Sequence, residues 1–187
     1  MIKNIIKHFV TVTRHRNGVM KNCFRAGIPM RGLLHDLSKF SREEFFESAR
    51  HYQGTRSPTE HERETNGYSV VWMHHKGRNK HHFEYWVDID PNTKKYGPVK
   101  MPTKYLIEMF CDRIAASKIY KGKSYTDASA YDYFMGGRAR KIMHHETAAE
   151  LEYLLQILKD HGEKAGFKAA REMLKKDKAE RKAKKHK

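Results

Sequence analysis

The residues best suited to chemistry are an adjacent histidine and aspartate, His35 and Asp36, within the stretch RGLLHDLSKF at residues 31–40. The pair follows two leucines, so we expect it near the core, where a charged carboxylate is costly unless paired or bound to a metal. Imidazole suits Zn, Fe and Ni, and carboxylate suits Mg and Mn, so a mixed set admits several divalent metals. Taken alone, the dipeptide could instead be a helix end with a solvated aspartate.

Further metal-ligand candidates are spread widely along the chain. They are the histidines and aspartate at His15, His74, His75, His81, His82 and Asp112. His8 is a rival for His15. His74 and His75 cannot both face the core of one regular helix, and His75 is preferred because it shares a face with Trp72. The choice between His81 and His82 stays open, and both are kept.

Helices must carry these residues. Helical spacing and capping signals predict helices over residues 2–26, 30–40, 41–52, 58–75, 103–120 and 147–162, with Gly18 a possible bend in the first. Residues 124–140 are expected to be helical only in part, and 87–100 to form an irregular loop. Because no run alternates like a strand, the predicted fold class is all-α.

Length and composition set the remaining bounds. The 187 residues predict one helical domain over residues 1–162 and a basic helical or disordered tail over 163–187. No run approaches the ~18 to 20 apolar residues of a membrane span. Two cysteines form neither a disulfide framework nor a zinc-finger spacing. These features, with no signal-peptide pattern, predict a cytoplasmic protein.

Positive charge is concentrated at the C-terminal end. The chain carries a formal charge of +16, and the stretch from Lys164 to Lys187 supplies +8 of it. Such a tail can bind nucleic acid through its phosphates, although no aromatic residues are interleaved for base stacking. A solvated helix is the alternative interpretation.

The ordered pattern of histidines and aspartates resembles the HD-domain superfamily of metal-dependent phosphohydrolases. The words that carry the resemblance are LLHDLSKF at residues 33–40 and the stretch from His75 through Asn79 to Trp86. The latter looks like a less characterised bacterial and phage family related to HD domains. The similarity covers most of residues 8–160, and it implies an HD-domain-like helical bundle.

What the resemblance implies for individual residues is a site for one or two divalent ions (Mn, Fe, Ni, Zn or Mg). The implied ligands of the first ion are His15, His35, Asp36 and Asp112, with Asp36 able to bridge to a second ion held by His75, His81 and His82. Lys39 would orient a phosphate or protonate a leaving oxygen, and Arg78 would neutralise phosphate oxygens. His51, His61, Glu44 and Glu84 are candidates for supporting roles.

The function that follows is metal-dependent hydrolysis of a nucleotide or related phosphate ester, an anionic substrate that the positive charge would attract. The spacing of seven residues from His75 to His82 and the lack of a Gly-Tyr-Pro triplet argue against cyclic-dinucleotide cleavage. One alternative is an HD-type diiron oxygenase. Another is a nucleotide- or nucleic-acid-binding module whose metal site is structural or degenerate.

Overall fold

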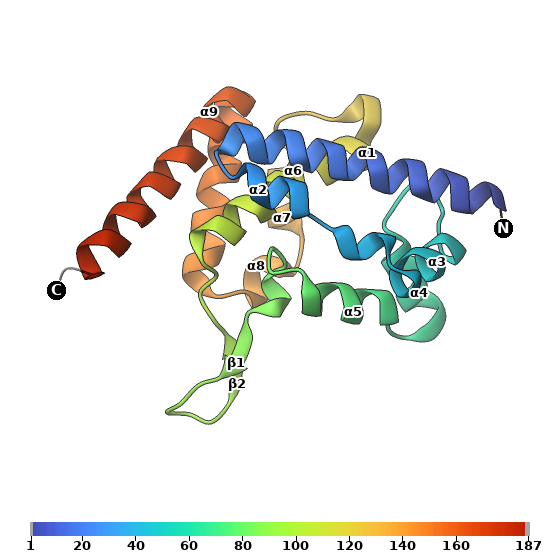
Figure 1. Cartoon of the computed structure of the whole chain (residues 1–187), viewed down its shortest axis with the longest axis horizontal. Helices are drawn as coiled ribbons and strands as arrows, with labels where there is room; N and C mark the ends of the chain where they lie inside the picture. The colour runs from blue at the N-terminus through green and yellow to red at the C-terminus, as the bar shows by residue number, and fades with distance from the viewer. Residues whose placement is uncertain (1, 186–187) are drawn as a thin grey trace.

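The chain folds into a helical bundle with one small hairpin, which confirms the predicted all-α class (Figure 1). The computed structural model describes residues 2–185. Its α-helices are α1 Ile2–Ala26, α2 Pro29–Leu34, α3 Arg42–Arg50, α4 Pro58–Asn66, α5 Val70–Arg78, α6 Thr103–Lys121, α7 Ser129–Gly136, α8 Ala139–Ile142 and α9 His145–Lys185. Short 3₁₀ helices are η1 Leu37–Phe40, η2 Phe83–Tyr85 and η3 Gly122–Ser124.

Helix α6 is the centre of the core, packed against α1, α7 and α9. It buries nearly every side of its middle, from Leu106 to Ala115, and the leucines of α9 pack against it. Burial of these apolar side chains is the main force that holds the helices together. A helix enclosed in this way carries its few polar side chains, among them Glu108, into the interior.

Close approach of α1 to α6 depends on small residues. Gly18 does not bend α1, which runs without interruption from Ile2 to Ala26. A Cβ atom at Gly18 would lie 3.3 Å from the Cβ of Ala115, so the glycine lets the two helices approach closely. Their approach brings His15 of α1 and Asp112 of α6 together.

The predicted helix over residues 30–40 is wrong in one respect, because it breaks at His35 and Asp36. Helix α2 ends at Leu34, and Asp36 has a φ of 52°, in the left-handed region, before η1 begins at Leu37. Aspartate adopts this conformation more readily than most residues. The break turns both side chains into the interior, where each is 1% exposed.

Two other segments differ from expectation. The predicted helix over 58–75 is two helices, α4 and α5, because Gly67 adopts a φ of 79° and ends α4. The expected loop over 87–100 contains an antiparallel hairpin of β1 Val87–Ile89 and β2 Tyr96–Pro98 (Figure 1). Both strands have only three residues, too few to show an alternating pattern in the sequence.

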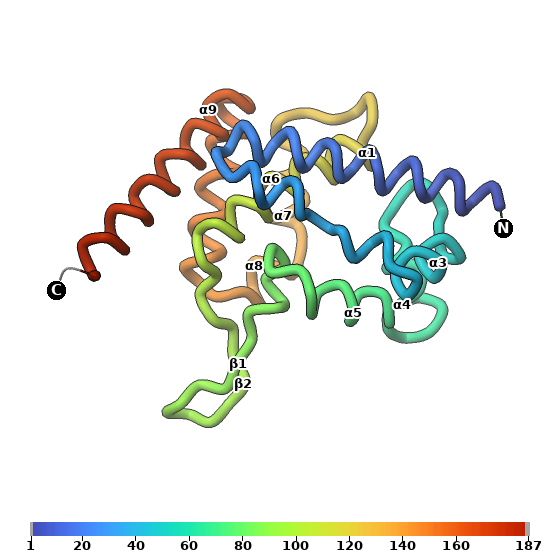
Figure 2. Tube along the Cα trace, viewed as in Figure 1, coloured from blue at the N-terminus to red at the C-terminus, as the bar shows by residue number. Residues whose placement is uncertain are grey.

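The basic C-terminal segment is helical through residue 185 and begins as part of the core. Helix α9 kinks at Gly162, and beyond the kink it still buries Phe167, Ala170 and Leu174. Past Leu174 the helix extends away from the bundle (Figure 2). Among residues 2–185, no helix is both long and apolar enough to cross a membrane.

Gly32 fixes the position of α2, and so of the break that follows it. A Cβ atom there would lie 2.7 Å from the Cβ of Cys23 and 3.0 Å from the Cα of Met20. Because that contact is partly with backbone, Gly32→Ala should lower the free energy of unfolding by about 1–3 kcal/mol. Denaturant unfolding measures it.

Gly77→Ala is the matched control, since Gly77 lies in α5 and a Cβ there meets nothing within 4 Å. Its stability should stay equal or rise by up to about 1 kcal/mol, because alanine favours a helix. Equal stabilities for the two variants would contradict the close approach of α2 to α1.

Candidate metal centre

Seven side chains from separate parts of the fold converge beside the break after α2. Helix α1 supplies His15, the break supplies His35 and Asp36, and α5 supplies His75. The turn before η2 supplies His81 and His82, and α6 supplies Asp112. The structure thus brings together all seven predicted metal ligands. They span 98 positions of the sequence, so only the tertiary fold can collect them.

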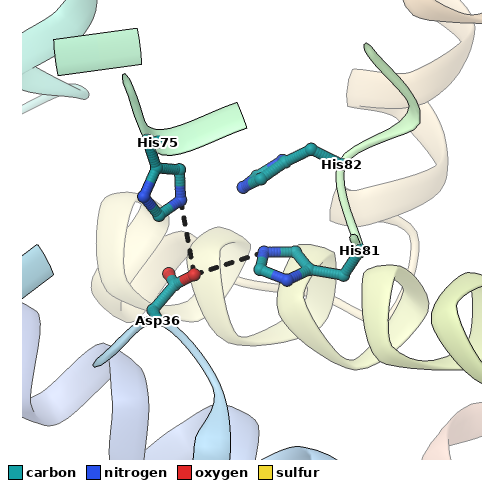
Figure 3. Close-up of side chains that lie close together, drawn as sticks. All are labelled: Asp36, His75, His81 and His82. Carbon is teal, nitrogen blue, oxygen red and sulfur yellow. Dashed lines mark ion pairs between the residues drawn. The ribbon is translucent and has the colours of Figure 1, made fainter. Parts of the chain in front are cut away.

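Asp36 lies at the centre of this cluster. Its Oδ1 is 3.3 Å from the Nε2 atoms of both His75 and His81 (Figure 3). Its Oδ2 is 3.2 Å from Nε2 of His35 and 3.8 Å from Nε2 of His15. Each carboxylate oxygen therefore faces a different pair of imidazoles, as a carboxylate that bridges two ions would.

Two of the groups of potential ligand atoms meet at Asp36. One group is Asp36, His75, His81 and His82, and the other is His15, His35 and Asp112; within each, the atoms lie within 4.8 Å of one another. His82 enters the first group from above the Asp36 carboxylate, as Figure 3 shows. A pair of adjacent divalent-ion sites fits this arrangement.

The donor atoms of the cluster have the chemistry that a bound cation requires. Within residues 2–185, both oxygens of Asp36 and the Nε2 atoms of all five histidines are buried and lack a hydrogen bond of good geometry, although His15 Nε2 is 2.9 Å from Asp112 Oδ1 and Lys39 Nζ is 2.6 Å from Asp36 Oδ2. Buried polar atoms in proteins are normally satisfied, and unsatisfied ones cost about 1–3 kcal/mol each. Metal ions would satisfy them all, and the N and O donors suit Zn, Fe, Ni or Mn.

Glu108 supports the cluster from the Nδ1 side of two histidines, and it was not among the predicted site residues. Its Oε1 accepts from Nδ1 of His35 at 3.1 Å and lies 3.5 Å from Nδ1 of His81, while Arg31 binds its Oε2 at 2.7 Å. Such a carboxylate fixes which ring nitrogen is free for a metal. One signal was present: Glu108 stands one helical turn before Asp112, on the same face of α6.

Glu44 supports the other side of the site. Its Oε2 accepts from Nδ1 of His75 and its Oε1 from Nδ1 of His74, both at 2.7 Å. The preference for His75 over His74 as ligand agrees with this placement, because His74 points its ring only toward Glu44. Ser41 caps α3 by accepting from the Glu44 amide, which positions this carboxylate.

The carboxylates of the cluster are stabilised as anions. Burial alone would raise the pKa of Asp36, but His35 and Lys39 hold that pKa well below its usual range. Burial also opposes ionisation of Asp112, yet its contact with His15 keeps the pKa well below the usual range. Both are therefore charged at neutral pH, as carboxylate ligands must be.

The imidazoles differ in protonation. Burial by itself would lower the pKa of His35, but the neighbouring carboxylates of Asp36 and Glu108 have the larger effect, so the pKa is raised to about 10. Burial, reinforced by His81, holds the pKa of His82 well below its usual value. His82 is thus ready to bind a cation, whereas His35 must first release a proton, so metal affinity should rise with pH.

The remaining predicted residues fall at different distances from the cluster. Lys39 reaches it from η1, with its Nζ 2.6 Å from Oδ2 of Asp36. The structure does not bring Arg78 into the cluster: the side chain is exposed and donates to the carbonyl of His74 at 3.3 Å. His8 packs against Phe45 instead of entering the site.

Three supporting candidates are also placed. His51 and His61 share a hydrogen bond of 3.0 Å between their Nδ1 atoms, apart from the two ligand groups. Glu84 is half-buried, and burial raises the pKa of its carboxyl. Its Oε2 lacks a hydrogen bond within the described residues.

Comparison with models of protein families shows which family the chain belongs to. Residues 4–157 match the model of a family of unknown function, DUF5662. The chain belongs to this family. The match includes every ligand candidate and both supporting glutamates, and it ends before the kink of α9 at Gly162. No curated protein and no solved structure matched the chain.

Replacing the central carboxylate tests the site directly. Asp36→Ala should reduce the bound metal from about two ions per chain to none or one, because its two oxygens face imidazoles of both groups. Elemental analysis of protein purified without chelator gives the stoichiometry, and circular dichroism checks folding. Asp132→Ala removes an exposed aspartate of α7 and should leave the metal content unchanged. Equal metal content in both variants would exclude Asp36 as a ligand.

The supporting carboxylate should control affinity without binding the metal. Glu108→Gln keeps the shape but weakens the hold on His35 and His81, so metal affinity should fall about 10- to 100-fold. Titration with a competing chelator measures this, with Glu150→Gln, in α9, as the control. Unchanged affinity in Glu108→Gln would show that the histidines are oriented by other contacts.

Proposed function

We propose that this protein is a metal-dependent phosphohydrolase with a mono- or dinuclear His/Asp centre. The observation that carries the proposal is the convergence of the Nε2 atoms of four histidines on the two oxygens of Asp36, with a fifth, that of His82, beside them. Divalent ions bound there would lower the pKa of a coordinated water towards ~7 and would clamp phosphate oxygens. The similarity of LLHDLSKF to the HD-domain motif supports the same chemistry.

Lys39 suits the handling of a phosphate group. Its ammonium lies beside Asp36, and its side chain is 32% exposed while that of Asp36 is 1% exposed. Asp36 raises the pKa of Lys39 against the opposing effect of burial, so the side chain is a cation at neutral pH. A charged donor at the edge of the site can neutralise a phosphate oxygen or protonate the departing oxygen.

The site is accessible from the side of the second ligand group. Asp112 and His15 have side chains 16% and 10% exposed, whereas that of His35 is 0% exposed. An anionic substrate would approach there, drawn by the net charge of +16. We propose a nucleotide or related phosphate ester. Both cysteines, Cys23 and Cys111, are free and buried, which suits a reducing, cytoplasmic setting.

The Lys39→Ala variant separates chemistry from metal binding. Its metal content should equal that of the unaltered protein, while kcat for hydrolysis of p-nitrophenyl phosphate or a nucleoside monophosphate should fall about 100-fold or more. Assays with added Mn, Zn, Ni or Mg identify the active ion. Lys121→Ala removes an exposed lysine at the end of α6 and should retain full activity.

The outcomes distinguish the candidate functions. Hydrolysis that survives intact in Asp36→Ala would show that this centre is not the catalyst. Bound iron with oxygen consumption and no hydrolysis would favour the diiron oxygenase. Bound metal with neither activity would favour a binding module with a structural site. Loss of metal in Lys39→Ala would mean that this lysine supports the site instead of acting on substrate.

A further inference from the structure

A second feature with binding chemistry is a cleft on the other side of Glu108. It has a volume of about 360 Å³ and lies between the start of α2, the start of α6 and the outer half of α9. The outer half of α9 passes the turn between α1 and α2 on its way out of the bundle (Figure 1). The size is in the range of small-molecule sites.

The wall formed by α9 is anchored. Arg171 donates to the carbonyl of Arg25 at 2.5 Å, and the guanidinium of Arg25 lies 4.1 Å from the ring centre of Phe167. Leu174, which lines the cleft, is only 8% exposed. The basic helix is therefore held against α1 and α2 at the point where it borders the cleft.

The lining combines an apolar part with positive charge. Ile28, Met30 and Leu174 supply apolar surface, and the cations around them are Arg31, Lys104, Lys178 and Arg181. Asp177 is the one acidic residue of the lining, and it pairs with Arg181 at 3.0 Å. Lys104 and Lys178 form no ion pair within residues 2–185, and Arg31 pairs with Glu108 through Nε alone, so the cleft is complementary to an anion that carries an apolar group.

Arg31 is held in an orientation suited to an anion. Its Nε donates to Oε2 of Glu108 at 2.7 Å, and its guanidinium lies 4.8 Å from the ring centre of Tyr105. Within residues 2–185 its two terminal nitrogens make no hydrogen bond, and the side chain is 29% exposed. A guanidinium fixed in this way offers two parallel donors to phosphate oxygens at little cost in entropy.

We propose that this cleft is a second binding site, for a small phosphate ester with an apolar or aromatic group, such as a nucleoside monophosphate. The phosphate would lie among Arg31, Lys104 and Lys178, and the apolar group would pack on Ile28 and Leu174. The site is separate from the metal centre, because Glu108 stands between Arg31 and the imidazoles. It does not depend on the proposed hydrolysis.

Calorimetry on the full-length protein tests this, with metal removed by chelator so that the metal centre cannot bind the probe. Adenosine monophosphate should bind more tightly than inorganic phosphate, because only the former covers the apolar part. Lys104→Glu and Lys178→Glu, on opposite walls, should each weaken that binding about fivefold or more. Both residues are exposed, so folding should be unaffected.

Lys176→Glu is the matched control. It makes the same change in net charge on the same helix as Lys178→Glu, at an exposed position outside the cleft. Its affinity should stay within about twofold of the unaltered protein. If all three variants weakened binding of adenosine monophosphate equally, the affinity would come from the general attraction of anions to a basic protein, and the proposal would be overturned. Equal affinity for phosphate and adenosine monophosphate, or no binding of either at millimolar concentration, would also overturn it.

Discussion

The buried carboxylate of Asp36 is the constraint on which the rest of the site depends. An ionised carboxylate in the interior costs several kcal/mol unless charge and hydrogen bonds compensate for it. Here the compensation within the chain is partial, since Lys39 pairs with one oxygen and neither oxygen has a hydrogen bond of good geometry. Four imidazoles are directed at the same carboxylate, so a cation bound among them would complete the compensation. The cost of burying the Asp36 carboxylate thus explains why the other residues of the site lie around it.

The histidines are held by carboxylates on the side away from Asp36. Glu108 binds the Nδ1 side of His35, and Glu44 binds the Nδ1 side of His75. Each glutamate is itself nearly inaccessible to solvent, and Glu108 has a further partner in Arg31. Fixed Nδ1 contacts leave Nε2 as the atom available to a ligand, so the orientation of the rings is set before any ion binds.

Close packing of helices makes this arrangement possible. The contact between Gly18 and Ala115 brings α1 against α6, and Gly32 brings α2 against α1. These approaches place His15, the break at residues 35–36 and Asp112 within a few ångströms. The same packing sets the cationic cleft beside Glu108, because the outer half of α9 is fixed on the end of α1 by Arg171.

Much of this could be predicted from residue order alone. Helical periodicity and capping signals predicted most helices, since these signals are local, and the resemblance to the HD-domain pattern implied the seven ligand candidates. The left-handed Asp36, the hairpin and the role of Glu108 could not be predicted. The conformation of Asp36 and the role of Glu108 depend on contacts between residues distant in sequence: a glutamate on α6 becomes a partner of His35 only when α2 and α6 pack together. The hairpin is local, but its three-residue strands are too short to show an alternating pattern. The sequence by itself thus determined most helices and supplied the candidate ligands, because helical signals are local, and the tertiary structure decided which nitrogen and oxygen atoms meet.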